Sequence, residues 1–323
     1  MGSTPIRCIR FFIGTFYVSI KIEHDICSWW CFKKTMPLSI TDGALPWQRL
    51  AVTNKHIRDE RISFEEETHT YTIDGERAGW VSCTGFIHGF FSPFNPDEVI
   101  HKMMKSSKWK PGGESYEKYN GMTADEIKKK WSDDGGDSSS RGTRMHMDIE
   151  RYYNASPIGN LAADDWEANA STEWDYFMAF EKRWRIPRGL YPFRTEWLVF
   201  NDKIKLAGSI DMVFTKSDGT LAIYDWKRAK EIKYDNKYQT ALQPIQHLPD
   251  TNYWHYSLQL NVYRRMLELF YDVKVSELAL VILHPNNRSF KVIQLNLMDD
   301  EVEAMFRRRA EMLAAGVEAV KHT

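Results

Sequence analysis

Two predicted strands joined by a tight turn constrain this chain most. Segments 205–214 and 220–227 are largely apolar, and "KSDGT" lies between them. A short turn that contains Asp-Gly predicts an antiparallel hairpin. The second strand ends in "DWK", and strand side chains alternate, so Asp225 and Lys227 share one face while Trp226 points to the other. Alone, this pattern is equally typical of a surface strand that ends in a mild ion pair.

The hairpin brings a second acidic residue toward Asp225. Asp211, in "GSIDMVF", lies near the end of the preceding strand, so folding the arms together makes the two carboxylates neighbours. Carboxylates at that distance repel each other unless a cation neutralises them, and a hard divalent ion prefers oxygen ligands. Lys227 would stand beside that ion and stabilise negative charge on a phosphate. The spacing therefore favours a metal site for phosphoryl chemistry.

A predicted helix over 142–153 carries a second pair of polar residues. His146 and Glu150 are four residues apart, so they share one helix face. Histidine is a good metal ligand, and a glutamate can orient metal-bound water. The alternative is an ordinary exposed helix face. The order "HMDIE" differs from the H-E-x-x-H zinc motif, which disfavours a zinc protease.

Gln259 and Tyr263 form a similar pair on a predicted helix over 253–270. Their spacing puts one amide and one phenol on a shared face. Such a pair can position a phosphate or a base edge. The alternative is the polar rim of an amphipathic helix.

The order of elements after residue 141 predicts the fold class. A helix precedes three strands, and a second helix and further strands follow, which fits a mixed α/β sheet flanked by helices. Besides the segments already given, we expect helices over 164–184 and 299–319 and strands over 193–200, 277–285 and 288–297.

The preceding region is expected to be a hairpin followed by helices. "ISFEEETHTYTIDGER" alternates apolar and polar residues and ends in a turn at Asp74 and Gly75. Asn95 and Pro96 begin one helix, and Thr123 with Glu126 forms a capping box for another over 123–131. The polar segment 132–142 is predicted to be a loop. We therefore divide the chain into an extension (1–35), an N-terminal hairpin and helical region (36–140) and a core (141–323).

Composition excludes several classes of protein. The net charge is −1, so a nucleic-acid site must be a local patch rather than the whole surface. The four cysteines (Cys8, Cys27, Cys31 and Cys83) all lie in the first third, which indicates a reducing compartment without a disulfide framework. The apolar run within 1–35 is about half the length that spans a bilayer. We expect a soluble intracellular protein of the cytoplasm, nucleus or a virus factory rather than of the mitochondrion, and no membrane partner.

The segments "GTRMH…E", "GSID", "DWK" and "QLNVY", in that order, resemble the RecB-like branch of the PD-(D/E)XK nucleases. This branch includes the RecB and AddB nuclease domains, CRISPR-associated RecB-type exonucleases and mitochondrial genome maintenance exonuclease. The resemblance covers roughly 141–285, and "FEEETHTYTIDG…VSCTGFIHGFFSPF" is similar to the N-terminal part of viral and phage members. It implies a restriction-endonuclease-like αβββαβ core.

The resemblance also implies roles for individual residues. His146, Asp211, Asp225 and the backbone carbonyl of Trp226 would bind the metal. Lys227 would be the catalytic lysine, Glu150 the acid on the first helix, and Gln259 and Tyr263 the Q-x-x-x-Y pair near the active site. Glu196, in "RTEWLVF", receives a supporting role. Relatives with an iron–sulfur cluster carry three cysteines after the core, whereas this chain has none beyond Cys83, so no cluster is expected.

The resulting hypothesis is a DNA nuclease, an exonuclease rather than an endonuclease, that uses Mg²⁺ or Mn²⁺ in recombination, repair or replication. Its substrate would be DNA with a free end or in single-stranded form. Basic residues expected to grip the DNA backbone are Arg141, Arg144, Arg228, Lys230, Lys233 and Lys237. Two alternatives remain: an inactive nuclease fold that binds nucleic acid or protein, and a hydrolase of small phosphoesters. Protein partners and oligomeric state cannot be deduced from these residues.

Overall fold

The chain forms two compact units, Met1–Gly43 and Ala44–Thr323. The computed structural model describes residues 9–13, 16–20, 48–154 and 168–316. In the first unit, β1 (Ile9–Ile13) and β2 (Phe16–Ile20) pair in antiparallel fashion. The expectations for Cys8, Cys27 and Cys31 lie outside the described residues.

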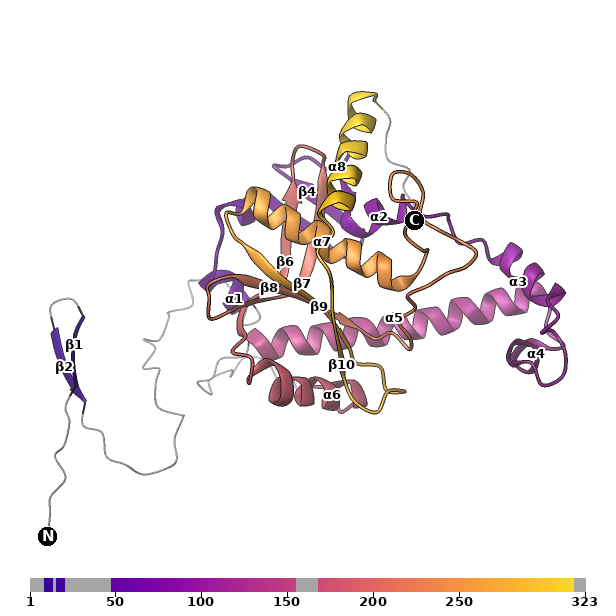
Figure 1. The fold of residues 1–323 in the computed structure, drawn as a ribbon, viewed down its shortest axis with the longest axis horizontal. Coiled ribbons are helices and arrows are strands. Elements are labelled where there is room, and N and C mark those ends of the chain that lie inside the picture. The colour runs from indigo at the N-terminus through magenta and orange to yellow at the C-terminus, as the bar shows by residue number, and fades with distance from the viewer. Residues whose placement is uncertain (1–8, 14–15, 21–47, 155–167, 317–323) are drawn as a thin grey trace, which may run out of the picture. The chain divides into compact units, whose positions relative to one another are not determined.

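A mixed sheet forms the centre of the second unit (Figure 1). Its order is β10-β9-β8-β7-β5, and β6 also pairs with β7. β7 runs antiparallel to β6 and β8, whereas β8 is parallel to β9. The strands are β5 (Val81–Ser82), β6 (Tyr191–Asn201), β7 (Leu206–Thr215), β8 (Leu221–Lys227), β9 (Val275–Ile282) and β10 (Lys291–Gln294). The predicted helix-flanked mixed sheet is confirmed.

The predicted hairpin between β7 and β8 is also confirmed. Their register pairs Met212 with Tyr224 and Thr215 with Leu221. The turn closes through a hydrogen bond from the amide of Lys216 to the carbonyl of Thr220. Gly219 has φ +80°, a backbone conformation that residues with a Cβ rarely adopt.

Helices cover both faces of the sheet (Figure 1). One core cluster joins α2, α7 and α8 to one face, and a second joins α5 and α6 to the other. The helices are α1 (Arg49–Thr53), α2 (Cys83–His88), α3 (Pro96–Lys105), α4 (Glu114–Tyr119), α5 (Ala124–Asn154), α6 (Thr172–Phe180), α7 (Asn252–Phe270) and α8 (Asp299–Ala314), with short turns η2 (Ile57–Arg61) and η3 (Glu181–Arg185). The predicted helix over 164–184 begins at Thr172 among the described residues, and the last helix ends at Ala314, earlier than expected.

The predicted loop over 132–142 is wrong, because α5 runs through it without a break. The expected capping box starts this helix: the amide of Glu126 donates to Oγ1 of Thr123, and Oε2 of Glu126 accepts from the amide of Thr123. Both halves of α5 also belong to packed cores. Extending a helix between two anchored halves costs far less free energy than starting one. Residues 132–142 are therefore helical although many of them are weak helix formers. The division at 140/141 stays a prediction.

The predicted hairpin over 62–77 forms with an earlier turn than expected. β3 (Ile62–Glu65) and β4 (Thr70–Ile73) pair in antiparallel fashion, so the connection lies between them. Asp74 and Gly75 do form a turn, with φ of 51° and 81°, but it follows β4. None of the helices in the described ranges combines the length and apolar composition needed to cross a membrane.

Candidate active site

The candidate site lies where β7 changes its neighbour. Residues 212–215 of β7 pair with β8, whereas residues 206–207 pair with the short strand β5. Between these stretches, residues 208–211 of β7 pair with neither β8 nor β5. Asp211 is the first residue beyond the β8 ladder, so its carboxylate stands at a fork in the sheet.

The backbone of Trp226 fixes two groups at this fork. Its amide donates a hydrogen bond of 3.0 Å to Oδ2 of Asp211. Its carbonyl oxygen lies 3.0 Å from Nε2 of His146, which reaches the fork from α5. The indole ring is buried in the core between the sheet and helices α5 and α6. One buried residue therefore anchors ligand candidates from a strand and a helix.

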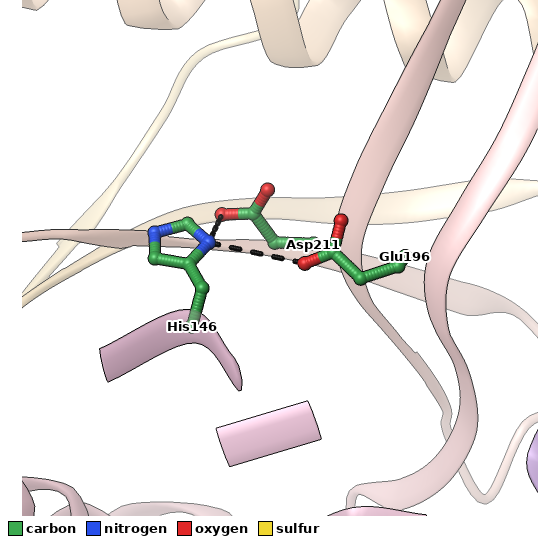
Figure 2. A group of neighbouring side chains, drawn as sticks. All are labelled: His146, Glu196 and Asp211. Atoms are coloured by element: carbon green, nitrogen blue, oxygen red, sulfur yellow. Dashed lines mark ion pairs between the residues drawn. The ribbon is translucent and has the colours of Figure 1, made fainter. Parts of the chain in front are cut away.

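His146, Glu196 and Asp211 form one group of possible metal ligands (Figure 2). Nδ1 of His146 lies 3.5 Å from Oδ2 of Asp211 and 3.8 Å from Oε1 of Glu196. One donor atom from each residue lies within 4.8 Å of the others, and all three residues are half-buried. This separation suits donor atoms that surround a single ion.

Glu196 occupies a strained position in this group. It lies between the register pairs Thr195–Met212 and Trp197–Ile210, directly across from Asp211. Its φ is +41°, which for a residue with a Cβ costs on the order of 1 kcal/mol. Oε2 accepts a hydrogen bond of 2.9 Å from the hydroxyl of Ser209. Glu196 was expected to have only a supporting role, but it lies in the central cluster with His146 and Asp211.

Asp225 and Lys227 lie next to this group, on β8. Asp225 is buried, and its Oδ2 lies 2.7 Å from Nζ of Lys227. The same Nζ lies 4.7 Å from the centre of the Tyr256 ring on α7. The predicted shared face is confirmed, because Trp226 packs toward the opposite side of the sheet. Asp225 does not belong to the three-residue ligand group among the described residues.

Burial and mutual charge shift the pKa values of these groups. Burial alone would lower the pKa of His146, but the carboxylates of Asp211 and Glu196 outweigh it and raise that pKa to about 9. Burial, followed by the charge of Asp211, raises the pKa of Asp225 to about 7, and Lys227 opposes this shift. Burial also raises the pKa of Asp211. Without a divalent cation, the site therefore holds protons that carboxylates in water would release.

Glu150 lies beside the ligand group rather than in it. It shares a cavity of about 240 Å³ with Glu196, Arg194 and Asp59. Burial and then the charge of Glu196 raise its pKa to about 7. Glu150 is therefore poised to exchange a proton near neutral pH.

Gln259 and Tyr263 meet as their spacing predicted. Nε2 of Gln259 lies 3.2 Å from the hydroxyl of Tyr263, to which it donates. Tyr263 is only 4 % exposed, so it cannot contact DNA directly. It packs against Gly208, where an added Cβ would come within 2.6 Å of the tyrosine ring and 3.0 Å of Cβ of Cys83. The glycine of "GSID" therefore makes room for this tyrosine.

Three of the predicted DNA-contacting cations already have acidic partners. Arg141 pairs with Asp137 at 3.1 Å, Arg144 with Asp148 at 3.0 Å, and Arg228 with Glu173 at 2.6 Å. The pair of Arg228 is mostly buried, so this side chain is unsuited to a solvent-facing grip. Lys230, Lys233 and Lys237 are exposed.

The donor set fits a hard divalent cation. It offers one imidazole nitrogen and two carboxylates, with a third carboxylate and an ammonium group adjacent. Carboxylate oxygens suit Mg²⁺ and Mn²⁺, and an imidazole is compatible with Mn²⁺. The ammonium group favours an anionic ligand on the same ion. Such an arrangement is suited to hydrolysis of a phosphate ester.

The chain is similar to one protein family and to several solved structures. The sequence model of the PD-(D/E)XK nuclease superfamily matches residues 116–322. Among solved structures, the chain is similar to a "Putative exonuclease" from Eubacterium rectale, at 11% identity and a TM-score of 0.36, over 76% of this chain and 86% of that one. It is also similar to SSO0001, at 11% identity and a TM-score of 0.30, over 74% and 77%. Among curated proteins, none matches the sequence.

Proposed function

The chain belongs to the PD-(D/E)XK nuclease superfamily, and from that premise we propose that it is a divalent-metal-dependent deoxyribonuclease of the RecB-like branch. We infer an exonuclease that acts on free or single-stranded DNA ends in recombination, repair or replication. The observation that carries the proposal is the grouping of His146, Glu196 and Asp211 within 4.8 Å, beside Lys227. The order of the RecB-like motifs supports the choice of branch.

We assign His146, Glu196 and Asp211 as ligands of Mg²⁺ or Mn²⁺, with Asp225 next to them. When bound, the ion would neutralise phosphate charge and lower the pKa of a coordinated water molecule. The raised pKa of Asp225 is consistent with a position where a cation normally compensates the carboxylates. Asp225 also keeps Lys227 in place through their 2.7 Å contact.

The backbone carbonyl of Trp226 receives an orienting role in this proposal. A carbonyl can only accept a hydrogen bond, so Nε2 of His146 carries the hydrogen of the 3.0 Å contact. A neutral imidazole with its hydrogen on Nε2 leaves the lone pair of Nδ1 facing Asp211 and Glu196. The contact thus selects the tautomer that binds metal.

Lys227 is proposed to stabilise the charge that develops on the phosphate. Its Nζ is held between the Asp225 carboxylate and the face of the Tyr256 ring. Preorganised cations of this kind are most effective in half-buried sites, because water screens them little. Glu150, with its pKa raised to about 7, is placed to move a proton at the edge of the site.

Substrate positioning is proposed to involve Gln259 from α7 and exposed cations near the site. Tyr263 would act indirectly, by holding the Gln259 amide at 3.2 Å. Lys230 is exposed and is proposed to contact the DNA backbone. The carboxylate partners of Arg141, Arg144 and Arg228 compete with phosphate for these guanidinium groups.

Digestion of end-labelled DNA tests the proposal. Linear and circular DNA, each single- and double-stranded, are incubated with Mg²⁺ or Mn²⁺ and with EDTA. We expect EDTA-sensitive loss of linear substrates and resistance of circles. Cleavage of circular DNA would show that the enzyme is an endonuclease rather than an exonuclease. Absence of cleavage from every substrate would contradict the nuclease proposal.

A catalytically inactive binding module is the alternative, and the site argues against it. Lys227 and the acidic residues are all present and adjacent, whereas loss of catalysis commonly removes one of them. The same digestion separates the two: a binding module would retain labelled DNA without shortening it.

A further inference from the structure

A cavity of about 700 Å³ lies at the N-terminus of α7, outside the ligand group. Residues on its wall come from the start of the helix and from the loop before it. Those used below are Lys233, Lys237, Tyr238, Thr251, Asn252 and His255.

The start of α7 offers unused hydrogen-bond capacity to this cavity. The first intrahelical bond runs from the amide of His255 to the carbonyl of Thr251, so the three amides between these residues have no partner within the helix. Thr251 is only 7 % exposed, its side chain does not cap the helix, and no group in the described ranges forms a hydrogen bond with its Oγ1. Buried hydroxyls are normally bonded. An anion in the cavity would satisfy this hydroxyl and the helix terminus together.

The loop adds cations and aromatic rings. Its segment "KYDNKY", 233–238, holds two Lys-Tyr pairs separated by Asp235 and Asn236. Within the described part of the chain, no ion pair involves Lys233 or Lys237. Tyr238 is 93 % exposed, and Tyr234 is 53 % exposed. Single-stranded nucleic acid is bound by this combination, because cations follow the phosphates while aromatic rings stack on bases.

The loop is held against the helix rather than loosely attached. Oδ1 of Asn252 accepts from the amide of Lys233 at 2.9 Å, and Nδ2 of Asn236 donates to the carbonyl of Asp250 at 2.8 Å. The ring of Tyr234 packs on Tyr253, with centroids 4.5 Å apart. The lysines and tyrosines therefore project from a fixed frame.

Two carboxylates also line the cavity. Asp250 is engaged by Nε2 of His255 at 2.9 Å. Asp235 is exposed, so its charge is open to screening by salt, and Lys233 and Lys237 oppose it on the same wall. The cavity can therefore accept a phosphate.

The cavity and the candidate active site both lie along α7. Tyr256, whose ring contacts Lys227, lies about 8 Å beyond Thr251 at 1.5 Å of rise per residue. A strand cut beside Lys227 would pass the start of the helix within a short distance.

We propose that the N-terminus of α7 and the loop 233–238 grip the single-stranded DNA that leads into the metal site. Thr251, the first-turn amides, Lys233 and Lys237 bind a backbone phosphate, and Tyr238 stacks on a base. This inference rests on the proposed function, because it names the form of DNA that the nuclease site receives.

Binding of a fluorescein-labelled oligodeoxythymidine, measured by anisotropy in EDTA, tests the grip without cleavage. Tyr238→Ala should raise Kd for this probe about 5- to 100-fold and leave Kd for duplex DNA unchanged. Lys237→Gln should reduce the slope of log Kd against log salt by about 0.7. Thr251→Val should weaken binding without lowering the melting temperature, because the lost hydroxyl bonds to nothing in the free protein.

Matched controls are Tyr191→Ala, which removes a 62 % exposed tyrosine from β6, and Lys274→Gln, which removes an exposed lysine. Both should bind like wild type. If the loop variants also bind like wild type while the wild type binds and cuts DNA, this inference fails and the proposed nuclease stands. Equal weakening toward single strands and duplex overturns stacking by Tyr238. If the wild type binds neither DNA, the proposed function fails as well.

Discussion

The amide of Trp226 donates to Oδ2 of Asp211 at 3.0 Å, and the carbonyl of Trp226 lies 3.0 Å from the imidazole of His146. Asp211 lies on β7 and His146 on α5, so one residue of β8 sets the geometry of both. Backbone groups in a buried strand move little. The ligand group is therefore preorganised by the sheet rather than by flexible side chains.

Replacing Lys227 with alanine should strongly reduce catalysis while leaving DNA binding largely intact. Nζ contacts Asp225 and Tyr256 inside the site, and the role proposed for it is to stabilise transition-state charge rather than to bind the ground state. We expect kcat to fall about 10²- to 10³-fold. Steady-state cleavage and anisotropy measure the two effects, and Lys274→Ala is the control on an exposed lysine. Cleavage by Lys227→Ala at the wild-type rate would refute the catalytic assignment.

Glu196 and Glu150 should differ in their effect on metal affinity. Glu196 belongs to the ligand group and Glu150 does not. We expect Glu196→Gln to weaken Mn²⁺ binding at least about tenfold, and Glu150→Gln to change it much less. Titration calorimetry of the two isosteric variants provides the measurement. Equal losses would show that the ion is not centred on Glu196.

Gly208→Ala should disturb both stability and activity. The new Cβ would come within 2.6 Å of the Tyr263 ring, which must move and carry Gln259 with it. Overpacking of this kind costs about 1–3 kcal/mol. Gly142→Ala is the matched control, because nothing lies within 4 Å of its added Cβ and α5 should gain up to about 1 kcal/mol. Thermal unfolding and cleavage assays should distinguish Gly208→Ala from Gly142→Ala. A Gly208→Ala variant with wild-type stability and activity would contradict the packing of Tyr263 on Gly208.

Without divalent ions, the protein should lose stability as pH rises from about 6.5 to 9. His146 has a pKa raised from 6.5 to about 9 by neighbouring carboxylates against the effect of burial, so its stabilising charge is complete below 6.5 and lost through 9. The pKa of Asp225 is raised to about 7, chiefly by burial, so the folded state holds this proton more tightly than the unfolded state does. Asp225 therefore also lowers the stability of the protein as pH rises, but over a lower pH range than His146.

Divalent ions should reverse this trend. Mg²⁺ or Mn²⁺ requires a neutral imidazole and ionised carboxylates, so it competes with the bound protons. The rise in melting temperature on adding Mn²⁺ should be larger at pH 8.5 than at pH 6. A metal-free melting temperature that rises over the same pH range would contradict the charge arrangement.

Much of the site followed from local patterns in the sequence. The turn at Gly219 determines the β7–β8 register, and the last pair of that register, Met212 with Tyr224, brings Asp211 and Asp225 to the same end of the ladder. Helical spacing likewise placed Gln259 against Tyr263. Such features depend on neighbours in sequence, and they were predictable for that reason.

The remaining features depend on contacts between distant segments. Glu196 joins the ligands only because β6 pairs with β7 in a register that no local pattern reveals. Residues 132–142 read as a loop by composition, yet packing at both ends of α5 keeps them helical. Tyr263 is buried because α7 crosses β7 at Gly208, and no local pattern in the sequence indicates this crossing.

The central claim is that His146, Glu196 and Asp211 share one divalent ion. An anomalous difference map from a crystal soaked in Mn²⁺ tests it most directly. We predict a peak in contact with Nδ1 of His146 and with oxygens of Glu196 and Asp211, and its loss in Asp211→Asn. A map with no peak among these residues, or with Mn²⁺ bound only elsewhere, would contradict the account.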